Sequence, residues 1–222
     1  MTLEILYEDN HVIAVTKPNN IPVQADDSND KDMLTIVKEY IKEKYNKPGN
    51  VFLGLVHRLD RPVGGAIVFA KTSKGASRLS NEIRKQTFER KYLTVIEGHL
   101  NNSGTLEDYL VKNRKTNTSY VTSKDTKDAK RAVLDYKTIG VDEALSLLEV
   151  KLHTGRSHQI RVQLSNQNTP IFGDQRYNKL SKVGEQIALW SSEIKFKHPT
   201  KDEIITVTRQ PPNRYPWNRF TN

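Results

Sequence analysis

Residues 57–72 read HRLDRPVGGAIVFAKT, and this stretch decides the fold class. Its second half, residues 66–70, is a short apolar run that is typical of a buried strand. Its first half places Asp60 between two arginines, and Pro62 restricts the backbone of the turn. The pair Gly64-Gly65 lets another strand or a ligand approach the backbone closely. We therefore expect a polar turn that leads directly into a buried strand.

The side chain of Asp60 is the first candidate for chemistry. Its neighbours Arg58 and Arg61 favour its ionised form, because opposite charge stabilises a carboxylate. An ionised carboxylate on a fixed turn can act as a nucleophile or a base at neutral pH. An ordinary Asp–Arg surface pair has the same local sequence, so the assignment depends on a second polar block further along the chain.

Length and composition limit the classes of protein to consider. A chain of 222 residues suffices for one large domain or two small ones. The 35 Lys and Arg residues exceed the 26 Asp and Glu residues, and the net charge of +9 favours a polyanionic partner, RNA or DNA first. The absence of cysteine from the sequence excludes disulfides and Cys-ligated metals.

Targeting signals are also informative. Residues 1–10 carry acids and no long apolar core, so we expect no signal peptide. No apolar run of the sequence approaches about 18 residues, so we expect no membrane-spanning helix. The sequence therefore predicts a cytoplasmic protein.

Hydrophobic patterns predict strands and helices in mixed order. Helical spacing predicts one helix near residues 33–45, capped by Asp30 or Asp32, and another near residues 74–83, capped by Ser73. This order lacks strict βαβ alternation, so we expect an α+β fold on a mixed sheet and not a doubly wound one. Alternation and short apolar runs predict strands at residues 3–7, 11–15, 52–56, 66–70, 90–96, 132–139, 144–152, 195–198 and 203–208.

Residues 101–128 differ in composition from the rest of the chain. They are rich in Asn, Thr, Ser and Lys and have few apolar anchors. We expect a surface insertion with a short hairpin at best, whose basic side chains could touch phosphates. No linker is visible, so we expect a single domain over residues 1–222, with its tail pinned by Tyr215, Trp217 and Phe220.

The second polar block is TGRSHQIRV at residues 154–162, directly after a predicted strand. Its apolar residues alternate as in a strand, but Thr154, Gly155 and Ser157 suit a strand-to-helix turn, and we favour a helix. The free N–H groups at the start of such a helix would bind an anion. An arginine of this block could form a charge-assisted pair with Asp60. Spacing alone does not establish that the two blocks meet.

Together the two blocks resemble the RluA family of pseudouridine synthases. Residues 57–60, HRLD, have the form in which that family carries its catalytic aspartate, and residues 154–162 are similar to its second signature. The resemblance covers almost the whole chain. Shorter matches occur in the family's order at Lys17-Pro18, Arg90-Lys91-Tyr92, Gly173-Asp174 with Tyr177, and His198-Pro199.

The resemblance implies a fold and an activity. The fold is the pseudouridine synthase fold, a central mixed, mostly antiparallel β-sheet flanked by helices and loops. The activity is isomerisation of uridines in structured RNA, ribosomal or transfer RNA, without cofactor or metal. We expect a monomer with no DNA partner. The pattern begins close to residue 1, so we expect no S4-type domain ahead of it.

The resemblance also implies roles for individual residues. Asp60 is the nucleophile or base that starts cleavage of the glycosidic bond, and Arg161 pairs with it. Tyr92 stacks on the extruded uracil and helps remove the proton at C5, and Arg58 helps displace the target base. Further substrate-binding residues are expected at His57, Arg156, His158 and Gln159.

The residues themselves leave other interpretations open. Tyr92 lies in an apolar strand and fits a core position, and His57 and His158 fit hydrogen-bonded structural roles. A metal site at these two histidines lacks a third ligand, and a hydrolase triad with Asp60 lacks the Gly-x-Ser-x-Gly elbow. The main alternative function is a non-catalytic RNA-binding protein or RNA chaperone. A hydrolase that uses Asp60 as base lacks paired carboxylates at metal spacing.

Two stretches depart from the family pattern. Residues 61–65, RPVGG, replace the Thr-Ser-Gly step that many members carry after the aspartate. Residues 188–190, Ala-Leu-Trp, stand where members often show Leu-His-Ala. Both changes replace polar positions by apolar ones or glycine, so we expect altered packing or RNA contacts there.

Overall fold

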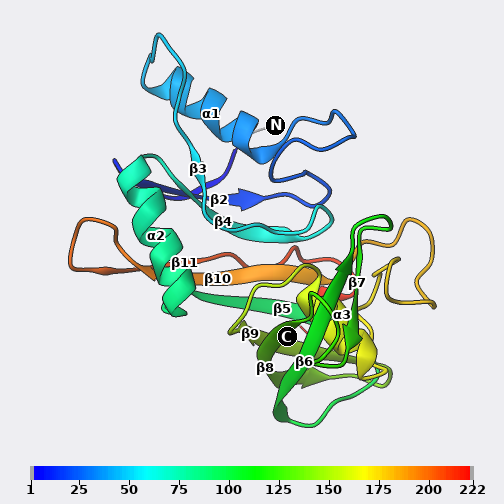
Figure 1. Cartoon of the computed structure of the whole chain (residues 1–222). Coiled ribbons are helices and arrows are strands. Elements are labelled where there is room, and N and C mark those ends of the chain that lie inside the picture. The colour runs from blue at the N-terminus through cyan, green and yellow to red at the C-terminus, as the bar shows by residue number, and fades with distance from the viewer. Residues whose placement is uncertain (1–2, 221–222) are drawn as a thin grey trace. The chain divides into compact units, whose positions relative to one another are not determined.

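The fold is that of a computed structural model, which describes residues 3–220. The chain divides into two compact units. Unit 1 comprises residues 1–90 and 191–210, and unit 2 comprises residues 91–190 and 211–222. Antiparallel strands and helices occur in both, which confirms the predicted α+β class (Figure 1). The prediction that residues 1–222 form a single domain is not tested by this division, and it stays a prediction.

The sheet of unit 1 forms around β4 (Gly64–Ala70), the strand predicted from the apolar run. All seven of its residues are buried, with β2 and β10 as neighbours. At Gly65, which has φ +116°, a Cβ would lie 2.3 Å from the Ser191 carbonyl oxygen, so this position requires glycine. The expected close approach of another strand is thus confirmed. The other strands of unit 1 are β1 (Ile5–Glu8), β2 (Val12–Lys17), β3 (Gly54–Leu55), β10 (Leu189–Lys197) and β11 (Ile204–Thr208).

Two amphipathic helices belong to unit 1, α1 (Met33–Lys44) and α2 (Ser73–Lys85). Asp32 caps α1, as predicted, and accepts a hydrogen bond from the Thr35 N–H at 3.0 Å. The predicted cap of α2 at Ser73 is wrong. Thr72 takes that place, and its hydroxyl accepts from the Gly75 N–H at 3.1 Å. Thr and Ser are both good caps, so the sequence did not distinguish these neighbours.

One hydrophobic cluster of unit 1 packs α2 against the sheet. Phe88 and Phe196 stack with ring centroids 5.6 Å apart, next to Leu79 of α2 and Val68 of β4. These side chains are almost fully buried, and each such burial stabilises the fold by roughly 1.5–3 kcal/mol. This cluster therefore fixes β4 and the turn that precedes it.

Unit 2 contains an antiparallel sheet in the order β5-β9-β8-β6-β7. The expectation of a short hairpin at best is wrong for residues 103–122, which form two strands of this sheet, whereas the insertion itself stays a prediction. There β6 pairs with β8 from Ser103 to Leu110 and with β7 from Tyr109 to Asn113. Backbone pairing on both edges holds β6 in place with few apolar side chains, which hid the strand in the sequence. The strands are β5 (Glu89–Glu97), β6 (Ser103–Asn113), β7 (Thr118–Thr122), β8 (Lys130–Val141) and β9 (Leu145–Leu152).

Helix α3 (Gln159–Asn166) confirms the helix predicted at the second polar block. It begins later than Thr154 or Ser157, and His158 precedes it in the left-handed conformation with φ +55°. The C-terminal tail is pinned by aromatic residues, as predicted. Tyr215 packs edge-on against Phe172 at 5.2 Å, and a short 3₁₀ helix, η1 (Trp217–Arg219), begins with a buried tryptophan. Among residues 3–220, no helix is long and apolar enough to cross a membrane.

Candidate active site

The Asp60 turn joins β3 to β4 in unit 1. The Val63 N–H donates to the Asp60 carbonyl oxygen at 3.0 Å, which closes a tight turn. Leu59 and Val63 are buried on either side, while Asp60 itself is half-buried. The apolar anchors and the hydrogen bond therefore hold the backbone of Asp60 in place and leave its side chain at the surface of the unit.

Lys17 is buried beneath this turn. Its ammonium donates to the carbonyl oxygens of Pro18 at 3.0 Å, Ile21 at 2.7 Å and Arg61 at 2.9 Å. Burial lowers the pKa of Lys17 to about 7, while the charge of Asp60 opposes this shift. The three carbonyl bonds also favour the ammonium, whose three hydrogens they use. Lys17 thus ties the loop after β2 to the turn that carries Asp60.

The two arginines that flank Asp60 behave differently. Arg61 extends to the acidic loop after β2, where it donates to Ser28 at 2.7 Å and to Asp26 at 3.2 Å, and it pairs with Asp30. Arg58 is exposed. The guanidinium of Arg61 therefore holds the acidic loop, and the expectation that both arginines favour the ionised form of Asp60 stays a prediction.

His57 lies inside unit 1. Its Nε2 accepts a hydrogen bond from the Val68 N–H at 3.1 Å, and its ring packs on Phe88 with centroids 5.4 Å apart. Burial, with a smaller contribution from Arg90, lowers the pKa of His57 to about 3. The imidazole is therefore neutral at physiological pH. These contacts favour the structural interpretation of His57 over the substrate-binding one.

Tyr92 lies in β5 of unit 2, opposite Val150 of β9, and is 5% exposed. This burial fits the core position, whereas stacking on a uracil requires that one face of the ring can be reached by the base. Its catalytic role accordingly stays a prediction.

Arg161, in α3, forms a buried bidentate ion pair. Its Nε and one terminal nitrogen donate to the two carboxylate oxygens of Asp174 at 2.8 and 2.7 Å. Its guanidinium also lies over the ring of Tyr177, 5.1 Å from the centroid. The predicted pairing of Arg161 with Asp60 stays a prediction, whereas Asp174 was missed as a partner. A buried arginine needs a carboxylate, and the quoted Gly173-Asp174 step was the signal that could have identified it.

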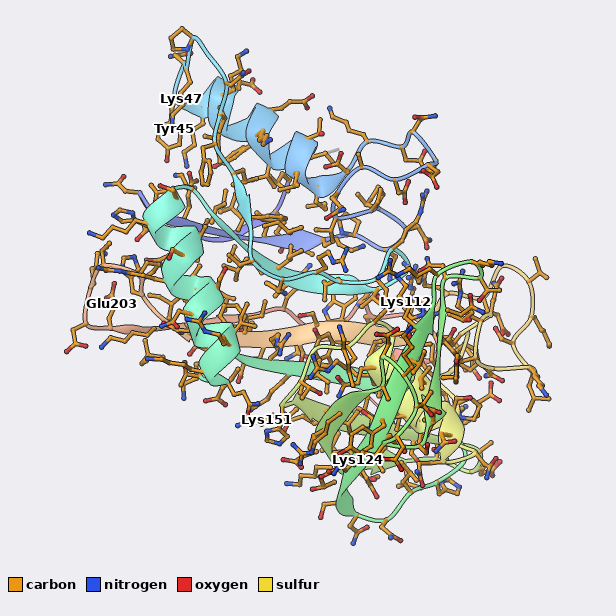
Figure 2. The ribbon with its side chains drawn as sticks, in the orientation of Figure 1. Tyr45, Lys47, Lys112, Lys124, Lys151 and Glu203 are labelled. Carbon is orange, nitrogen blue, oxygen red and sulfur yellow. The ribbon has the colours of Figure 1, made fainter. Side chains whose placement is uncertain are left out.

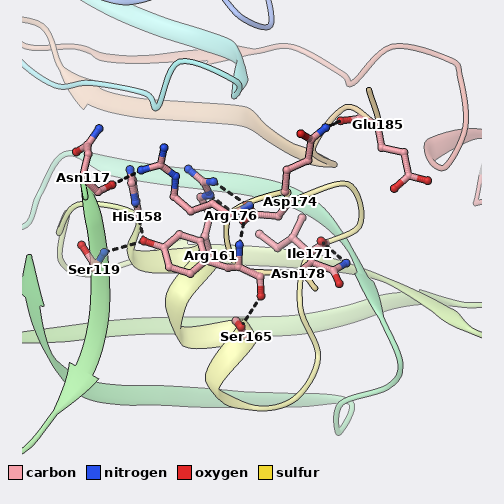
Figure 3. Close-up of polar contacts among 12 residues, drawn as sticks. Asn117, Ser119, His158, Arg161, Ser165, Ile171, Asp174, Arg176, Asn178 and Glu185 are labelled. Atoms are coloured by element: carbon pink, nitrogen blue, oxygen red, sulfur yellow. Dashed lines mark hydrogen bonds and ion pairs between the residues drawn. The ribbon is translucent and has the colours of Figure 1, made fainter. Parts of the chain in front are cut away.

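Tyr177 links Arg161 to the other residues of the second block (Figure 3). Its hydroxyl accepts from the Ser119 N–H and shares a hydrogen bond with Nδ1 of His158, both at 2.7 Å. Burial raises the pKa of Tyr177, so the phenol is protonated at neutral pH. The network thereby joins α3, the loop after Asp174 and strand β7, and it fixes the orientation of His158.

Gln159 and Arg156, both predicted to bind substrate, differ in exposure. Gln159 is buried; its Oε1 accepts from Thr154 at 2.7 Å and from the Arg156 N–H at 3.0 Å, and its Nε2 donates to Val133 at 3.1 Å. These bonds favour a structural role. The side chain of Arg156 donates to the Arg131 carbonyl oxygen at 2.9 Å and is exposed, so its charge can reach a ligand.

Known proteins match this chain over most of its length. The model of the RNA pseudouridylate synthase family matches residues 11–166. The uncharacterised RNA pseudouridine synthase YhcT of Bacillus subtilis is 34% identical, over 91% of this chain and 67% of that protein. The tRNA pseudouridine synthase C of Vibrio parahaemolyticus is 30% identical, over 91% of this chain and 88% of that protein.

Two further matches concern a ribosomal enzyme and a solved structure. The ribosomal large subunit pseudouridine synthase D of Zymomonas mobilis is 28% identical, over 95% of this chain and 69% of that protein. The structure of human RNA Pseudouridylate Synthase Domain Containing 4 superposes with a TM-score of 0.79 at 20% identity. The match covers 94% of this chain and 88% of that one. The fold is therefore shared with that structure.

Proposed function

The chain belongs to the RNA pseudouridylate synthase family and is an RNA pseudouridine synthase, and we propose that Asp60 is the aspartate that starts its reaction. In this isomerisation the bond between N1 of uracil and C1′ of ribose breaks. The base turns, a bond forms between C5 and C1′, C5 loses its proton, and N1 gains one. The atoms balance without an external reactant.

The observation that carries the proposal is the rigid support of Asp60. Its turn is closed by the Val63 N–H and tied from below by Lys17 through the Arg61 carbonyl oxygen. A carboxylate that must approach one atom of the substrate benefits from such preorganisation. The motif HRLD that contains it lies within the residues matched by the family.

We assign supporting roles in the same reaction to residues of both polar blocks. Arg161, oriented by Asp174, stabilises the charge of Asp60, and Tyr92 stacks on the extruded uracil. Arg58 and Arg156, both exposed, bind the RNA beside the target base. His158, fixed by Tyr177, lies at the start of α3 and contributes to RNA binding in unit 2.

We propose structured RNA as the substrate. The relatives are named for large-subunit ribosomal RNA and for tRNA, and both remain candidates. Basic side chains at both ends of the β6–β7 hairpin, of which Lys112 and Lys124 are labelled in Figure 2, suit the phosphate backbone. A cytoplasmic location and a monomeric state stay predictions.

Pseudouridine mapping of ribosomal and transfer RNA tests the proposal. Cells with the intact gene are compared with a deletion and with the Asp60→Asn variant. Sites that vanish in both altered strains establish the substrate and the role of Asp60 together. Sites that vanish only in the deletion would overturn the role of Asp60. If no site changes in either strain, a non-catalytic RNA-binding role becomes the better explanation.

A further inference from the structure

The outward face of α2 carries positive and neutral polar side chains and no acid. Its cations are Lys74, Arg78, Arg84 and Lys85. The one acid of the helix, Glu82, turns away and accepts a hydrogen bond from the Lys197 N–H at 3.0 Å. Gly75 and Leu79 are buried on the inward side. The charge of the outward face is therefore not balanced by acids of the same helix.

An open hollow of about 370 Å³ lies beside two of these cations, Arg78 and Arg84. It is lined by Ser77, Arg78, Ser80, Asn81 and Arg84. Arg78 donates to the Pro199 carbonyl oxygen, and Arg84 donates to Asn81 Oδ1 at 2.6 Å. These bonds orient the guanidinium groups without neutralising their charge. Hydroxyl, amide and guanidinium donors around one hollow are the groups that bind phosphate oxygens in protein–nucleic acid complexes.

Helix α1 shows what an ordinary solvated helix of this protein looks like. It alternates Lys38, Glu39, Lys42 and Glu43, and Lys31 pairs with Glu39. Mixed signs of this kind stabilise an exposed helix through neighbouring pairs. The outward face of α2 instead uses serine and asparagine, which are weaker helix formers. Helix stability therefore does not explain its composition.

We propose that the outward face of α2, residues 74, 77, 78, 80, 81, 84 and 85, binds the phosphate backbone of the RNA substrate away from the target uridine. The assignment rests on the proposed function, because it takes the polyanion to be that RNA. Helix α2 follows the end of β4 opposite to the Asp60 turn (Figure 1). Seven strand residues separate the two by about 20 Å. Only an RNA that extends this far can use both sites.

Two charge-reversal variants of the full chain test the proposal. One carries Lys74→Glu with Arg84→Glu on α2, and the matched control carries Lys38→Glu with Lys42→Glu on α1. Both change the net charge equally, at exposed positions of unit 1. The probe is an RNA hairpin of about 20 base pairs, whose dissociation constant is measured over a range of salt concentrations.

We expect the α2 variant to bind the hairpin about tenfold more weakly and to lower the salt slope by roughly 1.5. The control should stay within about twofold of the unaltered protein. Equal losses in the two variants, or no loss in either, would overturn the proposal. If circular dichroism shows that the α2 variant is unfolded, Lys74→Gln with Arg84→Gln replaces it, and the same comparison applies.

The same proteins separate this proposal from the proposed reaction. Pseudouridine formation by the unaltered protein is scored independently of hairpin binding. If no pseudouridine forms but binding still depends on α2, the RNA surface stands and the catalytic proposal fails. If pseudouridine forms and the α2 variant binds the hairpin as tightly as the control, the surface proposal alone fails.

Discussion

Two regions of this molecule hold a polar side chain in place by different means. The Asp60 turn in unit 1 is fixed through its backbone, by the Val63 N–H and by the ammonium of Lys17. Arg161 in unit 2 is fixed through its own side chain, by the carboxylate of Asp174. In the first region the hydrogen bonds of the support do not involve the carboxylate, although its charge favours the Lys17 ammonium. In the second region, the functional guanidinium of Arg161 and the supporting carboxylate of Asp174 form one ion pair, so neither can be changed without affecting the other.

The largest expected effect is the loss of activity in Asp60→Asn. We expect pseudouridine formation to fall at least about a thousandfold, about 4 kcal/mol of transition-state stabilisation, because the amide cannot act as base or nucleophile. The free energy of unfolding should fall by less than about 1 kcal/mol, because the turn is held through its backbone and the half-buried carboxylate contributes only its charge interaction with Lys17. Single-turnover assays and urea titrations measure the two quantities. Activity and stability falling together would remove the contrast between the regions.

Asp174→Asn should show the opposite pattern. Removing the carboxylate takes away the negative charge that holds the buried guanidinium of Arg161, which we expect to cost about 3 kcal/mol of folding free energy. Activity should fall as well, because Arg161 loses its orientation. The control is Asp135→Asn, whose carboxylate accepts from Thr105 at 2.7 Å on the surface of the same unit and should cost less than about 1 kcal/mol. Equal folding free energies of the two variants would show that the buried ion pair stabilises the protein no more than the surface carboxylate does.

The difference between support from neighbouring residues and support from distant ones also explains which features could be predicted from the sequence. The Asp60 turn and the buried strand after it depend on consecutive residues, and the pair Gly64-Gly65 signalled a close approach without naming Ser191 as the partner, so local chemistry was enough to find these features. The family motif then supplied the role of the aspartate. The pairing of Arg161 with Asp174 and the three carbonyl bonds of Lys17 depend on segments that fold together, and no spacing rule identifies such partners.

Strand β6 was missed for a related reason. Its stability comes from backbone pairing with β7 and β8, while its side chains alternate between exposed and half-buried, with Leu110 as a buried anchor. Sequence patterns detect buried apolar faces, and this strand has little of one. For His57 the motif predicted a ligand contact that the structure does not favour. Its ring is buried against Phe88, which favours a structural role.

The pH dependence of stability probes the support of the Asp60 region. The pKa of His57 is about 3 in the folded protein, against 6.5 without the fold. Between these values the unfolded chain binds more protons, so stability rises with pH in this window and falls on acidification. At about pH 5 the loss is roughly 2 kcal/mol relative to neutral pH.

The variant His57→Gln isolates this contribution. Its amide oxygen can still accept from the Val68 N–H, but it does not titrate. Urea unfolding at about pH 7 and about pH 5 should show a smaller acid loss in the variant, by roughly 2 kcal/mol. Identical acid losses in both proteins would mean that His57 is accessible to protons in the folded state.

The smallest expected effect is that of Tyr177→Phe in the Arg161 region. The change removes one hydroxyl, which accepts from the Ser119 N–H and is hydrogen-bonded to His158, and it keeps the ring under Arg161. We expect a loss of about 1–2 kcal/mol in stability, because a backbone N–H loses its partner. Tyr120→Phe is the control, since that tyrosine is 48% exposed and should lose almost nothing. One outcome would be that Tyr177→Phe loses stability as expected but lowers activity no more than Tyr120→Phe does. The orientation of His158 would then not be needed for the reaction, and the network would serve the Arg161–Asp174 pair alone.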